Sequence, residues 1–382
     1  MRFRLYPTAE QETVLIEHCS QARYVWNLAL EQFNLYRPSC GPTPNWVERS
    51  RQLTEARASF QWLAAGSREV QEKALRDFDQ ATKNWWGGSH CRPTWRTKGV
   101  HEGFRIADWV SIGRLNRRCG TIQIPKAGRV HFRWTRDPGQ PKSFRVTRDA
   151  AGRWWVAFAV MPQPLERTPS GAIVGIDRGV ANTIATSDGV LLHCPQPDAR
   201  ETARLKRLQR KMARQRPGSV RRAHTKVAIA KMRAHDADRA KDWTEKVTTQ
   251  LVLDYDRIVI EDLAIKNMTK SGRHKRGLNR VILANRWGIL ERRLTDKAAL
   301  ASVELIKINP AYTSQRCAAC GHVARENRKS QAAFECVSCG HEAHADVGAA
   351  INILAAGQAV AARGGPQFGP LKREPHFEPS AA

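Results

Sequence analysis

The sequence predicts an α/β protein with two additional parts, a small β-barrel and a helical region. Short apolar runs at 172–176 and 258–260, each followed by an acid, indicate buried strands of an α/β sheet. Alternating apolar and polar residues between 104 and 158 indicate the barrel, and apolar residues at helical spacing before them indicate the helical region. At 382 residues, 41% of them hydrophobic, the chain is long enough for several folded cores.

The N-terminal residues 1–8 are expected to form the first strand of the barrel. Phe3 and Leu5 alternate there with arginines, as in a strand with one buried face. Thr8 and Gln11 have the spacing of a capping box, which predicts that a helix begins directly after Thr8.

The helical region is expected over residues 9–100. Its first part predicts two successive helices broken near Ser20, which suit a helical hairpin or a DNA-reading helix-turn-helix. Because neither helix is clearly basic, the pattern favours the hairpin. The other barrel strands should lie in residues 101–165, so that the helical region is inserted between the first strand and the rest.

The α/β domain is expected over residues 171–311, with long basic helices at 200–253. A zinc-binding segment at 312–343 and a last helix at 344–362 should follow. The tail at 363–382 is rich in proline and is expected to be disordered.

Two Cys-x-x-Cys pairs predict one structural zinc ion. Cys317 and Cys320 form the first pair, and Cys336 and Cys339 form the second after fifteen intervening residues. Four thiolates in two tight turns at this separation are typical of a tetrahedral Cys₄ zinc site. Because the protein fills every ligand position, catalysis should come from other residues.

Three acids occupy the positions at which an α/β sheet presents functional groups. Asp177 ends the first strand, Glu261 ends the strand after the basic helices, and Asp346 begins the last helix. This order of elements is that of an RNase H-like domain, and such positions meet at the carboxyl edge of the sheet. Three carboxylates there can hold two Mg²⁺ or Mn²⁺ ions about 4 Å apart. We therefore expect two-metal hydrolysis of phosphodiesters.

The charge of the chain predicts a nucleic-acid partner. Lys and Arg number 63 against 36 Asp and Glu, a net charge of +27. The helix at 204–214 is the most cationic and is expected to lie along phosphates, although a solvated helix face would have the same composition. The candidate nucleic-acid contacts are Arg4, Arg204, Lys206, Arg207, Arg210, Lys211, Arg214, Arg221 and Arg222.

The remaining cysteines and the N-terminus indicate a reducing compartment. The odd number and irregular spacing of the other cysteines argue against a disulfide framework. They are Cys19, Cys40, Cys91, Cys119 and Cys194. The N-terminus has no apolar signal core, and no other run is expected to span a bilayer. We expect a cytoplasmic protein without a membrane partner.

Further motifs surround the acids. They are Gly-Ile-Asp-Arg-Gly at 175–179, Ser-Asp-Gly at 187–189, Glu-Asp-Leu at 261–263 and Asn-Pro-Ala-Tyr-Thr-Ser-Gln-Arg-Cys at 309–317. Together with the cysteine pairs, they resemble the TnpB (OrfB) proteins of bacterial insertion sequences, compact relatives of type V CRISPR effectors. The resemblance extends from Phe3 to about Gly357, nearly the whole chain.

The resemblance implies a RuvC nuclease site in which Asp177, Glu261 and Asp346 are catalytic. It also implies a guide RNA from the transposon end and cleavage of double-stranded DNA beside a short adjacent motif. We expect a monomer in the cytoplasm of a bacterium or archaeon, associated with the nucleoid. One departure is Gly348, which stands where the family often has Asn.

Two other functions fit parts of the sequence. A transposase or resolvase would act on element ends without RNA, but no nucleophilic Tyr or Ser motif of a strand-transfer enzyme stands out. A binding-only regulator derived from the nuclease would be expected to lack an acid, and all three acids are present.

Overall fold

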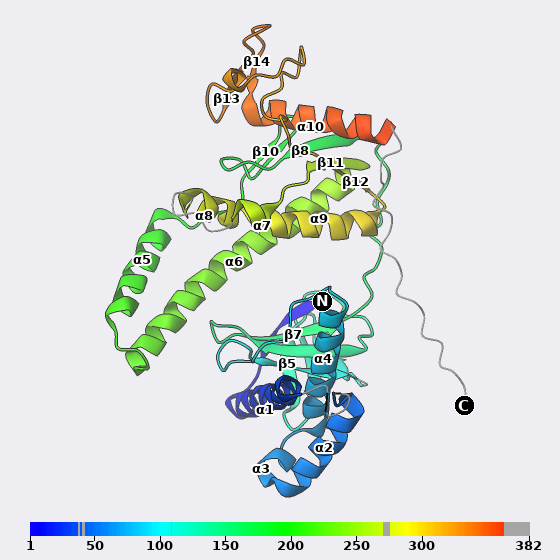
Figure 1. Cartoon of the computed structure of the whole chain (residues 1–382), viewed down its shortest axis with the longest axis vertical. Helices are drawn as coiled ribbons and strands as arrows, with labels where there is room; N and C mark the ends of the chain where they lie inside the picture. The colour runs from blue at the N-terminus through cyan, green and yellow to red at the C-terminus, as the bar shows by residue number, and fades with distance from the viewer. Residues whose placement is uncertain (37–38, 40–42, 108, 270–275, 363–382) are drawn as a thin grey trace, which may run out of the picture. The chain divides into compact units, whose positions relative to one another are not determined.

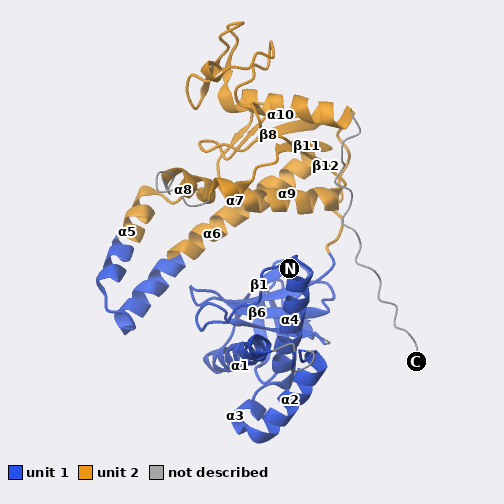
Figure 2. Cartoon of the chain, in the orientation of Figure 1, with its two compact units in different colours: residues 1–161, 207–231 blue, residues 162–206, 232–382 orange. Residues whose placement is uncertain are grey.

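The computed structural model describes residues 1–36, 39, 43–107, 109–269 and 276–362 (Figure 1). The chain divides into two compact units (Figure 2). Unit 1 comprises residues 1–161 and 207–231, and unit 2 comprises 162–206 and 232–382. The tail predicted to be disordered and Cys40 lie outside the described residues. The other cysteines are free thiols.

Unit 1 is built on a seven-stranded antiparallel sheet with the order β2-β6-β7-β1-β5-β4-β3. The N-terminal strand lies between β7 and β5, as the predicted insertion requires. Among the described residues, β2 and β3 each pair on one side, so the hydrogen bonds form an open sheet and not the closed barrel that we expected. The strands are β1 (Arg2–Tyr6), β2 (Gly103–Ala107), β3 (Ile112–Arg114), β4 (Cys119–Ile124), β5 (Gly128–Arg133), β6 (Ser143–Arg148) and β7 (Trp154–Ala159).

Among the residues that the structure describes, four α-helices accompany this sheet: α1 (Ala9–Leu35), α2 (Trp46–Ser59), α3 (Gln61–Ala64) and α4 (Arg68–Trp86). Residues of α1 and α4 share one apolar core with the buried face of the sheet. The predicted capping box at Thr8 and Gln11 is present. The predicted break near Ser20 is wrong, because α1 continues for 27 residues. The weak helix propensity of one exposed serine is small beside the packing of its buried neighbours.

Unit 2 contains the predicted α/β arrangement. Its five-stranded sheet has the order β10-β9-β8-β11-β12. The three strands β8, β11 and β12 are parallel, whereas β9 and β10 run antiparallel to their neighbours. The strands are β8 (Ile173–Asp177), β9 (Ile184–Thr186), β10 (Leu191–Leu192), β11 (Arg257–Glu261) and β12 (Glu304–Ile308).

Helices cover both faces of this sheet (Figure 1). On one face, α9 and the end of α6 contribute Leu290, Leu294 and Leu251 to a core with β8 and β11. On the other face, Ile353 of α10 packs against Val259, β12 and its own neighbours. The helices of unit 2 and of the basic segment are α5 (Ala199–Arg214), α6 (Val220–Asp254), α7 (Ile265–Met268), α8 (Arg276–Ala284), α9 (Trp287–Ala301) and α10 (Ala345–Ala362).

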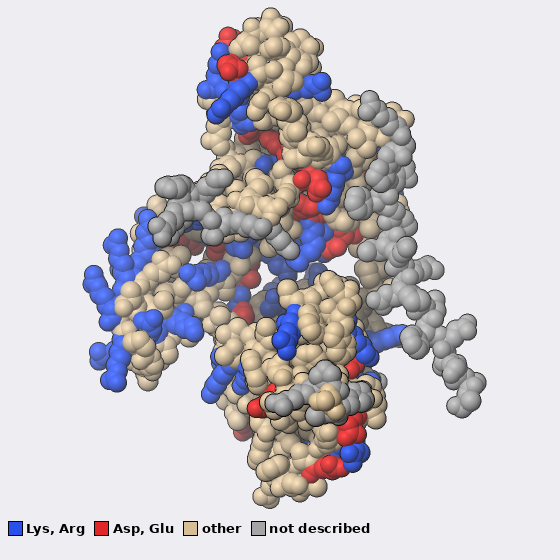
Figure 3. Space-filling model, viewed as in Figure 1, with Lys and Arg blue, Asp and Glu red and all other residues tan. Residues whose placement is uncertain are grey.

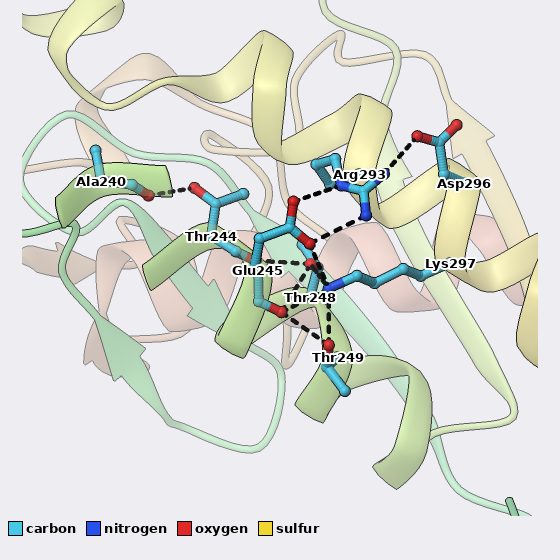
Figure 4. A network of polar contacts seen from close by, with 8 residues as sticks. All are labelled: Ala240, Thr244, Glu245, Thr248, Thr249, Arg293, Asp296 and Lys297. Atoms are coloured by element: carbon cyan, nitrogen blue, oxygen red, sulfur yellow. Dashed lines mark hydrogen bonds and ion pairs between the residues drawn. The ribbon is translucent and has the colours of Figure 1, made fainter. Parts of the chain in front are cut away.

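A partly buried polar network fixes α9 against α6 (Figure 4). The Glu245 carboxylate of α6 pairs with Arg293 at 2.8 Å and with Lys297 at 3.0 Å. Lys297 is only 6% exposed, and its ammonium also donates to Thr248 Oγ1 at 3.0 Å and Thr249 Oγ1 at 2.7 Å. Because a buried charge is costly without partners, these acceptors define how the two helices pack.

The composition of α10 contradicts the expectation that no segment could span a membrane. This 18-residue helix has a mean hydropathy of 1.4 and is long and apolar enough to cross a bilayer. However, Ala349, Ala350 and Ile353 are buried, and the helix contacts β8, β11 and β12. Packing on the sheet accounts for its apolar composition.

Two glycines let α10 lie close to the sheet. A Cβ at Gly175 would lie 2.2 Å from the carbonyl oxygen of Ala350, and a Cβ at Gly357 would lie 2.5 Å from the Val259 side chain. A Cβ at Gly348 would meet nothing within 4 Å. The departure at Gly348 therefore leaves open space on the first turns of α10.

This contrast predicts opposite stability changes for two similar substitutions. Gly348→Ala should stabilise unit 2 by about 0.5–1 kcal/mol, because alanine is the better helix former. Gly357→Ala should destabilise it by about 1–3 kcal/mol through overpacking against Val259. Denaturant unfolding of the two variants and wild type measures both changes. If the two substitutions destabilised the protein equally, the conclusion that a Cβ fits at Gly348 but not at Gly357 would be wrong.

Candidate active site and zinc centre

The parallel strands β8 and β11 place two of the predicted acids side by side. Ile176 pairs with Ile260, so the next residues, Asp177 and Glu261, occupy adjacent positions at the carboxyl ends of neighbouring strands. The close approach of α10 to β8 brings Asp346, on the first turn of that helix, to the same place. Burial, followed by the charges of Glu261 and Asp346, raises the pKa of Asp177 to about 7. The structure therefore brings all three predicted acids together.

Two residues that the sequence did not indicate hold Asp346. The Asn182 amide donates to Asp346 Oδ2 at 2.8 Å, and Arg328 donates to Asp346 Oδ1 at 2.9 Å. Asp346 is only 3% exposed, so these contacts replace water around a buried carboxylate. Asn182 lies in the turn after β8 and Arg328 in the cysteine-rich segment, and neither belongs to a motif that would have revealed its role.

Glu261 has partners of its own. The Thr313 hydroxyl donates to Glu261 Oε1 at 2.5 Å, and the Arg178 guanidinium donates to the Glu261 carbonyl oxygen. Burial raises the pKa of Glu261, and the Thr313 hydrogen bond and the Arg178 charge oppose this rise. Arg178 is itself paired with Glu291 at 2.7 Å. These contacts fix the ends of β8 and β11 relative to α9.

The turn between β8 and β9 requires glycine at position 179. A Cβ there would lie 2.8 Å from the Asn182 carbonyl oxygen and 3.4 Å from Asp346 Oδ2. The Asn285 amide donates to the carbonyl oxygens of Gly179 and Val180 at 3.3 and 3.1 Å. The turn is therefore held close to Asp346 from two sides.

The chemistry of these side chains suits hard divalent cations. Carboxylate oxygens are the ligands that Mg²⁺ prefers, and each Asp346 oxygen retains a lone pair beyond its hydrogen bond. Within the described residues, the four paired cysteines are the one set of three or more potential ligands whose ligand atoms all lie within 4.8 Å of one another.

The raised pKa of Asp177 predicts a pH-dependent stability. Its ordinary pKa is about 3.9, so below about pH 4 the group is protonated in the folded and the unfolded states. As the pH rises toward 7, the unfolded state ionises first, and the metal-free folded protein loses stability. Asp177→Asn should therefore raise the Tm more at pH 8 than at pH 5. Each kcal/mol gained in the free energy of unfolding should raise the Tm by roughly 2–4 °C. Melting curves in magnesium-free buffer test this; equal shifts at both pH values would contradict it.

The cysteine geometry fits a tetrahedral zinc ion. Cys317 and Cys339 have their Sγ atoms 3.8 Å apart, and those of Cys320 and Cys336 lie 3.6 Å apart. Four sulfurs at the usual Zn–S distance of about 2.3 Å would lie about 3.8 Å from one another. The structure thus confirms the predicted cluster of four ligands.

Each cysteine pair lies on a glycine-containing turn. Gly321 and Gly340 have φ values of 78° and 72°, in the left-handed region that favours glycine. Their backbone N–H groups donate to the carbonyl oxygens of Cys317 and Cys336 at 3.0 and 2.9 Å. Fully buried Asn327, which the sequence did not indicate, donates to His322 O at 3.3 Å and accepts from the Val337 N–H at 3.0 Å, so it joins the two turns. The strands β13 (Ala333–Glu335) and β14 (Glu342–His344) complete this segment.

Most of the predicted nucleic-acid contacts are exposed cations on the α5–α6 hairpin. None of the residues of α5 is buried. On the face seen in Figure 3, Lys and Arg side chains gather over this hairpin. The exposed members are Arg204, Lys206, Arg207, Arg210, Lys211, Arg214 and Arg221.

The other two predicted contacts have protein partners. Arg222 is half-buried and donates to the carbonyl oxygens of Met212 and Gln215, the latter at 2.9 Å, so it closes the turn between α5 and α6. Arg222 thus has a structural role in this turn, and its expected contact with phosphates stays a prediction. Arg4 lies on the sheet of unit 1, over the rings of Tyr6 and Trp155 at 5.7 and 5.2 Å.

The hairpin charges predict a uniform contribution to nucleic-acid affinity. Replacing Lys206, Arg207, Arg210 and Lys211 together with Gln should weaken binding about equally for every target sequence, because phosphate contacts carry no sequence information. The slope of log affinity against log salt should become shallower by up to about 0.9 for each phosphate that is no longer neutralised. A control set of three cations on α2 and α4 (Arg51, Arg68 and Lys83) is already ion-paired, and its replacement should change the slope little. A change in target preference would show that the hairpin reads sequence.

Comparison with known proteins gives matches along most of the chain. Residues 157–272 match the family described as "Probable transposase", and residues 287–353 match "Cas12f1-like, TNB domain". Residues 1–36 match "Helix-turn-helix domain". In the structure, residues 1–36 form β1 and the single helix α1, so no turn separates two helices there.

Two curated relatives span almost the whole chain. "Putative RNA-guided DNA endonuclease InsQ" of Escherichia coli (strain K12) is 34% identical over 98% of this chain and 96% of its own length. "Putative RNA-guided DNA endonuclease" of Streptomyces pristinaespiralis is 30% identical over 95% of this chain and 90% of its own length.

A solved structure shares the fold. It is that of the Cas12f1–sgRNA–target DNA complex, with a TM-score of 0.57 and 14% identity over 90% of this chain and 82% of that chain. The level and the extent of these matches show that the chain belongs to the TnpB (OrfB) family of insertion-sequence proteins, which is related to type V CRISPR effectors.

Proposed function

We propose that this protein is an RNA-guided DNA endonuclease of a transposable element, and that unit 2 is its RNase H-like (RuvC) nuclease domain with an inserted zinc ribbon. The observation that carries the proposal is the meeting of Asp177, Glu261 and Asp346 at the carboxyl edge of the sheet in a member of this family. The strand order supports it, because the first strand, β8, lies at the centre between the antiparallel β9 and the parallel β11.

The three acids would hold two Mg²⁺ or Mn²⁺ ions, and these ions would activate the attacking water and stabilise the leaving 3′-oxygen. Asn182 and Arg328 keep the Asp346 carboxylate oriented toward the site, and Thr313 does the same for Glu261. Because the pKa of Asp177 is about 7, this group must release its proton before it can act as a ligand.

The partners would be a guide RNA from the transposon end and double-stranded DNA with a short adjacent motif. The exposed cations of α5 and the net charge of +27 support a polyanionic partner. The protein would act as a monomer in the cytoplasm, close to the nucleoid.

The decisive experiment is to express the full chain with its transposon ends, sequence the RNA that co-purifies and test guided cleavage of DNA with Mg²⁺. We expect one discrete RNA from the transposon end and cleavage only of DNA that matches its guide segment. A transposase that acts without RNA would carry no discrete RNA. A binding-only regulator would carry RNA and bind DNA without cutting it.

A further inference from the structure

Unit 1 contains a cavity of about 320 Å³ that is rich in arginine. It lies beside β2, β6 and the segment that precedes β2, and its volume is in the range of small-ligand sites. The lining residues that matter here are Arg2, Arg96, His101, Arg145, Thr147 and Arg148.

Most charges around the cavity are already paired. The lining acids Glu102 and Asp149 bind Arg23 at 2.9 Å and Arg153 at 2.7 Å. Two lining arginines also have carboxylate partners, since Arg145 binds Asp77 at 2.6 Å and Arg148 binds Glu12 at 2.8 Å. None of these ion pairs includes the side chain of Arg96, which also lines the cavity.

Arg96 is fixed at the cavity with no direct ion pair to any described residue. Its backbone N–H donates to Asn27 Oδ1 at 2.8 Å, and its carbonyl oxygen accepts from Asn27 Nδ2 at 3.0 Å. Its guanidinium lies 3.6 Å from the centre of the Trp26 ring and makes no hydrogen bond or ion pair with any residue that the structure describes. Burial lowers the pKa of Arg96 to about 10, although the charge of Asp77 opposes this change. A partly desolvated cation of this kind is stabilised by an anionic ligand.

The neighbouring donors suit a phosphate. His101 Nδ1 accepts a hydrogen bond from the Thr97 N–H at 2.9 Å, so the neutral ring carries its proton on Nε2 and is a donor there. The planar guanidinium of Arg96 matches two oxygens of a phosphate. We propose that this cavity binds a backbone phosphate of a nucleic acid, with Arg96 as the principal contact. The inference rests on the proposed function in that it takes nucleic acid to be the partner, and it adds a specific site in unit 1.

Phosphate-ethylation interference on the full chain tests the site. The probes are a labelled RNA covering the transposon end and a labelled single-stranded DNA of the same sequence. Arg96→Gln should lower the affinity about 10- to 100-fold for the probe whose phosphate enters the cavity. In wild-type protein, ethylation of the one or two phosphates that enter the cavity should block binding. In the Arg96→Gln variant, ethylation of the same phosphates should have no effect on binding. Arg117→Gln removes an exposed charge outside the cavity and should change affinity less than about threefold.

A second variant tests the site independently, in case Arg96→Gln does not fold. Thr147→Glu places a carboxylate in the cavity and leaves Arg96 and Trp26 in contact, so it should cause the same loss with an unchanged near-ultraviolet circular dichroism spectrum. A loss confined to the RNA probe identifies the guide as the source of the phosphate, and a loss confined to DNA identifies the target.

If both variants bind both probes like wild type, the inference is wrong. Binding of inorganic phosphate alone, seen by ³¹P NMR without any effect on the probes, would also overturn it. Because these are binding measurements, a protein that passes them and yet fails to cut guided DNA would refute the proposed function alone.

Discussion

Replacing Asp177, Glu261 or Asp346 with alanine should lower the rate of DNA cleavage by about 10³-fold or more. Each carboxylate borders the site where metal ions would bind, and its replacement removes an anionic oxygen ligand. Nucleic-acid affinity should stay within about twofold of wild type, because it comes from cations elsewhere in the chain. Cleavage and binding of the same labelled DNA by guide-loaded protein measure the two quantities.

A matched control is available for this prediction. Asp242 is an exposed acid on α6 that pairs with Lys246 at 2.7 Å, so Asp242→Ala should leave cleavage unchanged. A variant of Asp177, Glu261 or Asp346 that cut DNA at the wild-type rate would remove that residue from the proposed site. Parallel loss of affinity and cleavage would instead indicate that the substitution unfolds unit 2.

Removing one zinc ligand should have an effect of similar size. Wild-type protein should contain about one equivalent of zinc, and Cys317→Ser or Cys336→Ser should lower both zinc content and solubility. Nuclease activity should fall with them, because the same segment supplies Arg328 to Asp346 and leads directly into α10.

Elemental analysis and cleavage assays check this prediction together. Cys91→Ser is the control, because Cys91 is an exposed thiol outside the cluster and its replacement should leave zinc and activity unchanged. Active wild-type protein that contains no zinc would refute the predicted ribbon. Full cleavage by a zinc-depleted Cys336→Ser variant would refute the dependence of Asp346 on the ribbon.

The sequence by itself determined those features that rest on local pattern. Alternation identified β1, capping-box spacing identified the start of α1, and the spacing of the cysteine pairs identified the zinc ligands. The acids Asp177, Glu261 and Asp346 could be named because strand ends and a helix start are visible in the chain. These signals depend on neighbouring residues, so they are complete before the chain folds.

Only the tertiary structure decided how remote segments meet. Asn182 and Arg328 reach Asp346 from positions 164 and 18 residues away, and such contacts leave no periodic pattern in a sequence. The same holds for Arg222, because nothing in its local sequence shows that its guanidinium closes the α5–α6 turn. The unbroken α1 and the apolar but sheet-bound α10 have the same cause. Apolar burial against distant elements contributes more to the free energy of folding than the local propensities on which the sequence predictions depend.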